Sequence, residues 1–286
     1  MTAALDIEHL QTWVGKTEVQ PDIIVPMRAA ALAAVLDDEH VPQPGEALPP
    51  LWHWIYFLSA ARQSQLGPDG HPRRGGFLPP VPLARRMWAG GRFEFHRPLR
   101  IGAEARRASR VAAVTYKEGS TGPLVFVQVR HEISDAEGIV LTEEQDLVYR
   151  EAPRPGETGA APKEPSGECA WRREIRPDPV LLFRYSALTF NGHRIHYDHP
   201  YATRVEGYPG LVVHGPLIAT LLLDLLRRNL PAAAVARFRF RAVRPLFDTA
   251  PFFVCGRPEA DGHTVALWAT DNEGRLAMEA TAELAG

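Results

Sequence analysis

The segment from Phe183 to Leu226 reads FRYSALTFNGHRIHYDHPYATRVEGYPGLVVHGPLIATLLLDLL. Its second part, from His214-Gly215 to about Asn229, is apolar nearly all round and has a proline in its first turn, which is typical of a buried helix. The first N–H groups of such a helix have no partner within it, and Gly215 lets a ligand approach the backbone closely. This helix start therefore predicts an oxyanion hole, a site that holds a carbonyl oxygen.

The loop before this helix, Thr189 to Tyr201, is dense in groups that can handle protons. It carries Asn191, His193, His196, Asp198 and His199. The H-x-x-H-x-D spacing lacks the Cys or Glu support of a zinc site, so we predict no metal. The sequence also lacks a G-x-S-x-G motif, a P-loop and a dinucleotide fingerprint. Our interpretation is that the loop holds a water molecule or a substrate proton.

A loop ending in H-x-D, a glycine-rich turn and His-Gly at the start of an apolar helix resemble the R-specific enoyl-thioester hydratases, which are MaoC-like dehydratases of the hot-dog fold. The wording from Tyr185 to Asp198 is closer still to a subgroup that includes the type 2 3-hydroxyacyl-thioester dehydratases and the mesaconyl-C4-CoA hydratases. The resemblance covers most of the chain. It implies a hydro-lyase that reversibly hydrates an enoyl-CoA to a 3-hydroxyacyl-CoA, with no cofactor because CoA is part of the substrate.

The family motif, Asp-x-Asn-Pro-x-His-x-Asp, assigns roles by resemblance. His196 takes the place of the catalytic histidine, and Asp198 is the last acid of the motif. Asn191 stands where the family has its catalytic aspartate, and an amide cannot take a proton from water. Two interpretations stay open: His196 serves as base and acid while Asn191 orients water, or His193 takes the missing role. Hydration of an enoyl thioester needs a base, an acid and a donor to the thioester oxygen, and this donor is expected from Gly215.

Further residues are expected to contribute to the substrate pocket. They are His214, Tyr185, Arg184, Arg85 and Arg86. His214 contacts the thioester region or caps the helix, and both alternatives stay open. A dicarboxylic substrate needs an arginine for its free carboxylate, and Arg28, Arg85, Arg86 and Arg184 are the candidates.

The second half of the chain repeats the first. Arg92-Phe-Glu-Phe corresponds to Arg237-Phe-Arg-Phe, and the turn Asp135–Gly138 corresponds to Asp271–Gly274. Alternation of apolar and polar residues predicts strands over 92–99, 106–116, 124–133 and 139–149. With the resemblance, we predict an α+β tandem (double) hot-dog fold in which each half is an antiparallel sheet wrapped around a central apolar helix.

The predicted domains are an N-terminal hot-dog at 1–150, a Pro/Gly-rich linker at 151–167 and a C-terminal hot-dog at 168–286. The apolar helix of the first half is expected at 48–58. Only the second half carries the histidine loop, so the resemblance implies that the first half is non-catalytic and shapes the acyl pocket. The fused pair would mimic the dimer of single hot-dog chains, and a homodimer or higher homo-oligomer is expected. Residues 61–91 are expected to form a long loop, either solvated or acting as a lid or a CoA contact.

Composition excludes several other classes of protein. The 286 residues are 45% hydrophobic and 23% charged, with a formal net charge of -2 and no long basic stretch, which argues against a nucleic-acid partner. The apolar helix is too short to span a membrane. The two cysteines, Cys169 and Cys255, have no metal-like spacing, and the N-terminus has no basic signal region. We therefore expect a cytoplasmic protein with an acyl-CoA substrate.

Three alternatives to the leading hypothesis remain. The substrate could be a dicarboxylic acyl-CoA such as mesaconyl-C4-CoA, giving citramalyl-CoA, or a straight-chain 3-hydroxyacyl thioester. Hot-dog folds also hydrolyse thioesters, which usually needs an acidic residue near the thioester, and Asn191 argues against it. A non-catalytic acyl-thioester binding protein is supported by Asn191 and opposed by the presence of His196 and Gly215.

Overall fold

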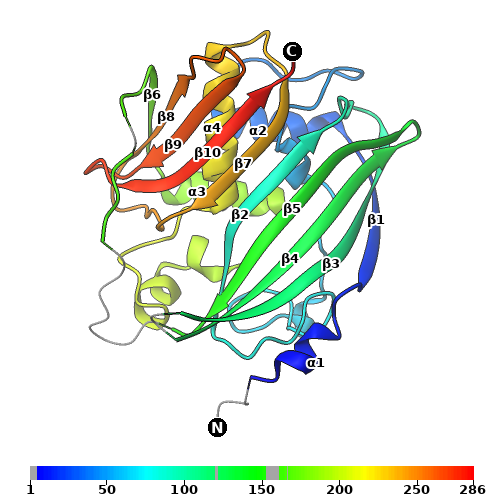
Figure 1. Ribbon diagram of the computed structural model, residues 1–286, viewed down its shortest axis with the longest axis vertical. Helices are drawn as coiled ribbons and strands as arrows, with labels where there is room; N and C mark the ends of the chain where they lie inside the picture. Colours follow the sequence, from blue (N-terminus) through cyan, green and yellow to red (C-terminus); the bar gives the residue numbers. More distant parts are fainter. Residues whose placement is uncertain (1–4, 120–121, 153–160, 166) are drawn as a thin grey trace.

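The computed structural model describes residues 5–119, 122–152, 161–165 and 167–286 (Figure 1). One ten-stranded sheet runs through it in the order β1-β3-β4-β5-β2-β7-β10-β9-β8-β6, and neighbouring strands are antiparallel. The strands are β1 Thr17–Ile23, β2 Arg85–Phe95, β3 Glu104–Gly119, β4 Gly122–Asp135, β5 Gly138–Arg150, β6 Trp171–Ile175, β7 Val235–Ala242, β8 Phe252–Pro258, β9 Thr264–Thr270 and β10 Leu276–Leu284.

Each half of the chain contributes five strands to the sheet, and the halves meet where β2 pairs with β7. From its outer edge inward, each half has its first, third, fourth, fifth and second strand in that order. Phe93 of β2 lies directly opposite Phe238 of β7, where the two predicted repeats meet. The equivalence extends to ion pairs, since Arg97 binds Asp135 in one half. Arg244 lies 3.6 Å from Asp271 in the other half. The internal repeat predicted from the sequence is confirmed.

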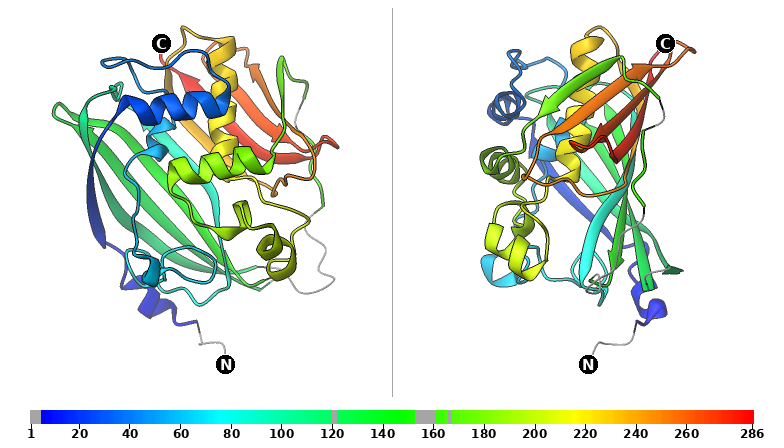
Figure 2. Two further views of the ribbon diagram at one scale, coloured as in Figure 1. Left: turned by 180° about the vertical axis from the view of Figure 1, so that it is seen from behind. Right: turned by 90° about the vertical axis from the view of Figure 1, so that its left-hand side faces the viewer.

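The helices α2, α3 and α4 lie on one face of the sheet, as Figure 2 shows. The longest, α4 Gly215–Asn229, packs against β6, β8, β9 and β10 of the C-terminal half. Two helices of 11 residues, α2 Pro26–Leu36 and α3 Pro179–Thr189, contact each other. The remaining helical segments are α1 Ile7–Gln11 and the short turns η1 Trp52–Ile55, η2 Gln63–Gln65, η3 Arg194–His196 and η4 Tyr201–Val205. No helix in the described ranges is long and apolar enough to cross a membrane.

One hydrophobic core joins the two halves. It contains Leu36 and Phe93 from the first half together with Leu222 and Phe238 from the second. Within α4, ten consecutive residues from Leu217 to Leu226 are buried, which explains why the helix is apolar nearly all round. The two sequence repeats therefore fold around a shared interior.

Three expectations need correction or fall outside the structure. The helix expected at 48–58 is only the 3-10 turn Trp52–Ile55, because Leu51 and Phe57 adopt positive φ angles of 68° and 53° that an α-helix cannot contain. The loop expected at 61–91 ends earlier, because β2 begins at Arg85. The expected linker 151–167 includes residues 153–160 and 166, which lie outside the described residues.

The sequence did not predict that β2 begins at Arg85, because the strand contains two consecutive glycines. Gly90 lies at an irregularity in the β2–β5 register, and a Cβ added there would lie 2.7 Å from the carbonyl oxygen of Phe240. Glycine is thus required by the close approach of β7. From the sequence, Gly90-Gly91 indicated a loop, whereas in the structure both glycines lie inside β2.

Candidate active site

The start of α4 opens onto a cavity of about 880 Å³ that is lined by residues from both halves of the chain. Gly215, the first residue of the helix, lies in its wall. A Cβ added to Gly215 would meet no atom within 4 Å, so a ligand atom has room beside the backbone. The N-terminus of the helix carries a partial positive charge. This geometry suits a developing negative charge on a thioester oxygen.

His196 lies in the short helix before this cavity and is buried. Its Nδ1 lies 2.7 Å from the carbonyl oxygen of Val212, so Nδ1 carries the proton and Nε2 keeps a lone pair. Burial lowers the pKa of His196 to about 4. The ring is therefore neutral at pH 7, and its Nε2 can accept a hydrogen bond from water.

His214 stacks on His196 with ring centroids 3.7 Å apart and an interplanar angle of 18°. Its Nε2 lies 2.8 Å from the hydroxyl oxygen of Ser186, and its side chain makes no capping bond to α4. His214 therefore occupies the N-cap position of α4 without capping the helix through its side chain. Burial lowers the pKa of His214 well below its ordinary value. The His214 ring is therefore neutral at pH 7, and it packs against His196 without adding a positive charge.

His193 and Asn191 both line the cavity. The ring of His193 stands perpendicular to that of His196 at 5.4 Å, and burial followed by the neighbouring histidines lowers its pKa to about 2. The Asn191 Oδ1 accepts the backbone N–H of His193 at 3.0 Å. The Asn191 carbonyl thus fixes the loop, which leaves only its amide group for the cavity.

Four of the predicted site residues do not line the cavity, namely His214, which stacks on His196, and three others. Asp198 accepts bonds from Arg194 Nε at 2.9 Å and from the backbone N–H of Tyr201 at 3.1 Å, so it fixes the loop. Tyr185 is buried behind the histidines, with its ring 5.0 Å from His214. Arg184 is exposed on α3 and lies outside the cavity wall. The structure therefore does not bring these side chains to the candidate reaction centre.

The arginine candidates separate clearly. Arg85 lines the cavity but pairs with Glu206 at 3.3 Å. Arg28 pairs with Asp22 at 3.2 Å and is not part of the wall. Arg86 lines the cavity, and its guanidinium makes no hydrogen bond or ion pair with any residue that the structure describes. Arg86 is thus the candidate with an uncommitted guanidinium.

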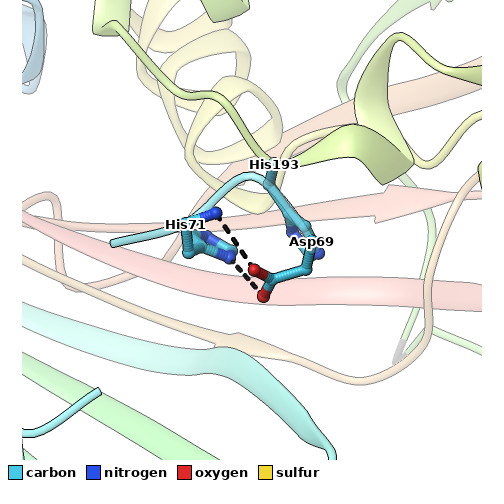
Figure 3. Close-up of side chains that lie close together, drawn as sticks. All are labelled: Asp69, His71 and His193. Atoms are coloured by element: carbon cyan, nitrogen blue, oxygen red, sulfur yellow. Dashed lines mark hydrogen bonds and ion pairs between the residues drawn. The ribbon is translucent and has the colours of Figure 1, made fainter. Parts of the chain in front are cut away.

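Two residues of the site were missed from the sequence. The loop between η2 and β2 brings Asp69 and His71 into the cavity wall, where Asp69 Oδ2 lies 3.0 Å from His71 Nδ1 (Figure 3). The His71 ring centroid is 4.1 Å from that of His193. Burial raises the pKa of Asp69, but the bonds from His71 outweigh it and hold that pKa well below the usual range. The sequence offered only one signal, an Asp-Gly-His in a loop already expected to be functional.

The missed loop is docked on the histidine loop by its backbone. The N–H of Arg194 donates to the Asp69 carbonyl at 2.9 Å, and the Arg194 guanidinium donates to the Pro68 carbonyl at 2.9 Å. A Cβ on Gly70 would lie 1.9 Å from the carbonyl oxygen of Gly192. Such close contact requires glycine and fixes the position of Asp69 and His71.

A metal ion was not expected from the loop sequence, but the fold gathers a different set of ligands. Asp69, His71 and His193 each present one ligand atom, and these atoms lie within 4.8 Å of one another. Two imidazoles and a carboxylate could hold a divalent transition metal. The Asp69 carboxylate already accepts both the ring and the backbone N–H of His71, so the group is also satisfied as a hydrogen-bonded pair.

A duplicated hot-dog with a histidine-lined cavity at the start of its central helix defines the class of MaoC-like dehydratases. A solved MaoC-like dehydratase from Phytophthora capsici matches 98% of this chain and 99% of its own, with a TM-score of 0.71 and 14% identity. A Mycobacterium tuberculosis protein described as having a double hot-dog fold matches 95% of this chain and 96% of its own, with a TM-score of 0.58 and 16% identity. The double hot-dog fold predicted from the sequence is confirmed.

The chain belongs to the hydroxyacyl-thioester dehydratase type 2 family, whose model matches residues 51–248. It is also similar to the mesaconyl-C(4)-CoA hydratase of Chloroflexus aurantiacus, with 50% identity over 275 residues that cover 96% of this chain and 97% of the relative. The predicted family is confirmed, and the chain is a hydro-lyase.

Proposed function

We propose that this protein catalyses the reversible hydration of mesaconyl-C4-CoA to citramalyl-CoA. The observation that carries the choice of substrate is Arg86, an uncommitted guanidinium in the cavity wall beside the histidines. The similarity to the mesaconyl-C(4)-CoA hydratase of Chloroflexus aurantiacus supports the same choice. A cytoplasmic, homo-oligomeric enzyme that needs no cofactor remains our prediction from the sequence.

The chemistry of this substrate demands a cation at one particular place. In mesaconyl-C4-CoA the carbon that water attacks, β to the thioester, also carries the free carboxylate. An arginine that binds this carboxylate must therefore lie next to the groups that hold the water. Such a charge-assisted bond also fixes the orientation of the planar carboxylate.

Arg86 meets this requirement through its position. Burial lowers the pKa of His71, and the positive charge of Arg86 lowers it further. The pKa of His193 is lowered by burial, by the neighbouring histidines and also by Arg86. The Arg86 charge thus lies near two of the histidines at the cavity, His71 and His193. A straight-chain enoyl thioester would leave this guanidinium without a partner.

The remaining groups fit the hydration reaction. The Gly215 N–H would donate to the thioester oxygen, where negative charge develops as water adds. The His196 Nε2 would accept one hydrogen of the attacking water, since its Nδ1 is committed to Val212. Both groups lie in the wall of the same cavity. The C-terminal half thus supplies an oxyanion donor and a water acceptor.

The test is the loss of absorbance of the conjugated enoyl-thioester band with mesaconyl-C4-CoA and crotonyl-CoA. The wild type should prefer mesaconyl-C4-CoA. Arg86→Ala should lower kcat/KM for that substrate by about 10- to 100-fold, the range expected for one bond to a charged group, and change crotonyl-CoA far less. His196→Ala should lower both by about 10²- to 10⁴-fold. Arg184→Ala, on the exposed side of α3, is the matched arginine control.

Other outcomes would assign the protein differently. Preference for crotonyl-CoA with no effect of Arg86→Ala would make the chain a straight-chain 3-hydroxyacyl-thioester dehydratase. Release of free CoA, followed with a thiol reagent, would make it a thioesterase. Acyl-CoA binding without turnover would make it a binding protein.

A further inference from the structure

Only one histidine at the cavity is hydrogen-bonded to a carboxylate within the described part of the chain. The four histidines around the start of α4 are His71, His193, His196 and His214. His196 binds a backbone carbonyl and His214 binds a hydroxyl group. The ring of His193 makes no hydrogen bond to a described residue. His71 alone shares its Nδ1 proton with an acid, Asp69.

This difference decides which ring can hold a transferred proton. The group that removes a proton from water must carry it as an imidazolium until the proton reaches the substrate. A positive charge in a buried site is costly unless an opposite charge compensates it. A carboxylate on the opposite ring nitrogen supplies that compensation and also fixes the tautomer. His193, His196 and His214 lack such a partner.

We propose that His71 is the catalytic base and acid of the hydration, and that Asp69 is the positioning residue that holds it. The proposal rests on the hydratase function proposed above. It assigns the proton-transfer group to the N-terminal half of the chain, which the sequence analysis had interpreted as non-catalytic. It also explains how the enzyme works with an amide, Asn191, where the family motif has an acid.

The step balances as follows. In this step the reacting water would lie between the Nε2 atoms of His71 and His196. One O–H bond of the water breaks, its proton goes to His71 Nε2, and the oxygen forms a bond to the β-carbon. The other hydrogen stays on that oxygen and donates to His196. The electron pair of the double bond moves onto the thioester as an enolate, which then takes the proton from His71 at the α-carbon.

The packing of the loop supports a role in chemistry. Asp69 and His71 are held from two sides, by their own pair of hydrogen bonds and by the backbone bond from Arg194 to the Asp69 carbonyl. A solvated loop would not need this fixed geometry, whereas a catalytic group must be held at a defined distance from its substrate. Because the loop is held in this way, the ring centroids of His71 and His193 lie 4.1 Å apart.

The test measures hydration by His71→Ala, His71→Gln and Asp69→Asn, together with thermal unfolding of each variant. We expect kcat to fall by about 10²- to 10⁴-fold for the His71 variants with KM close to that of the wild type. Added imidazole should restore part of the kcat of His71→Ala, because a small base can enter the space left by the ring. Asp69→Asn should also lose at least about 10²-fold in kcat, since the amide removes the compensating charge.

The control is His199→Gln, which changes an exposed histidine in the loop that carries His193 and His196. Near-normal kcat in the His71 variants, or a loss that imidazole leaves unchanged while the fold is intact, would overturn the proposal and leave the proposed function standing. A wild type that hydrates neither substrate would overturn the proposed function itself. Activity lost to a chelator, with one equivalent of divalent metal in the purified protein, would instead assign Asp69, His71 and His193 to a metal centre.

Discussion

Gly70 is the position where a single methyl group should separate the two loops of the site. Its φ of +88° is unfavourable for any residue with a side chain. An added Cβ would also lie 1.9 Å from the carbonyl oxygen of Gly192, whereas real Cβ contacts essentially never fall under 3.0 Å. In Gly70→Ala the loops must therefore move apart by about 1 Å, a displacement that can cost about 10²-fold in rate.

The structural cost of Gly70→Ala should be smaller than the functional one. The left-handed conformation costs about 1–2 kcal/mol, and each bond lost from Arg194 costs about 0.5–1.5 kcal/mol. A domain with the usual 5–15 kcal/mol of stability remains folded after such a loss. We therefore expect a folded protein with kcat/KM for hydration reduced about 10²-fold.

The assay combines hydration kinetics with hydrogen exchange of the Arg194 amide, which donates to the Asp69 carbonyl. Gly70→Ala should speed this exchange as the loops separate. Gly76→Ala is the matched control, because an added Cβ there meets no atom within 4 Å. A Gly70→Ala protein with normal kcat/KM and normal protection of Arg194 would refute the reasoning that loop docking builds the site.

Three further predictions concern the helix start, its buried acid and the buried histidines. Gly215→Ala should lower kcat/KM without lowering Tm, because the methyl group enters open space in the cavity, and full activity would contradict the oxyanion role. Asp224→Ala should lower the free energy of unfolding in urea by about 3 kcal/mol, because its fully buried carboxylate binds Arg173, Arg227 and Arg228 at 2.7, 2.6 and 2.7 Å; a loss within the scatter of surface mutations would contradict this. The pKa of His196 is lowered to about 4, and burial also lowers the pKa of His71, so kcat/KM should not fall near pH 6.5, where an ordinary histidine becomes protonated. In the unfolded chain His196 binds a proton near pH 6.5, whereas in the folded chain it stays neutral at that pH. The free energy of unfolding should therefore fall as the pH is lowered from about 6.5. A free energy of unfolding that does not change with pH would contradict the burial of His196.

Local sequence patterns predicted the parts of the fold that depend on local rules. The proline and leucines of α4 indicated a buried helix, and the paired Asp-x-x-Gly turns indicated a duplication. The apolar residues around Trp52 correctly indicated burial, but the positive φ of Leu51 and Phe57 is set by packing against distant residues. Periodicity cannot detect such a conformation, so it predicted a helix where the chain makes a single 3-10 turn.

The candidate site was predictable only where it follows a motif. His196 and Gly215 lie in the cavity wall as the family resemblance implied, although their catalytic roles remain predictions. Asp69 and His71 reach the same cavity from a loop more than a hundred residues earlier in the chain. The contact that brings them there is a backbone approach between Gly70 and Gly192, and two glycines in separate loops carry no pattern that identifies them as neighbours.

The duplicated fold suggests why the first half could take on such a role. In the C-terminal half, α4 packs across four strands and its first residue faces the cavity. At the equivalent place in the N-terminal half, the described residues between α2 and β2 form only short 3-10 turns and loops. Because the segment between η2 and β2 forms no helix, it can extend across the junction of the two halves and contact the histidine loop. If Asp69 then supplies the carboxylate, the motif position at Asn191 no longer needs an acid, and its side chain can fix the His193 backbone instead.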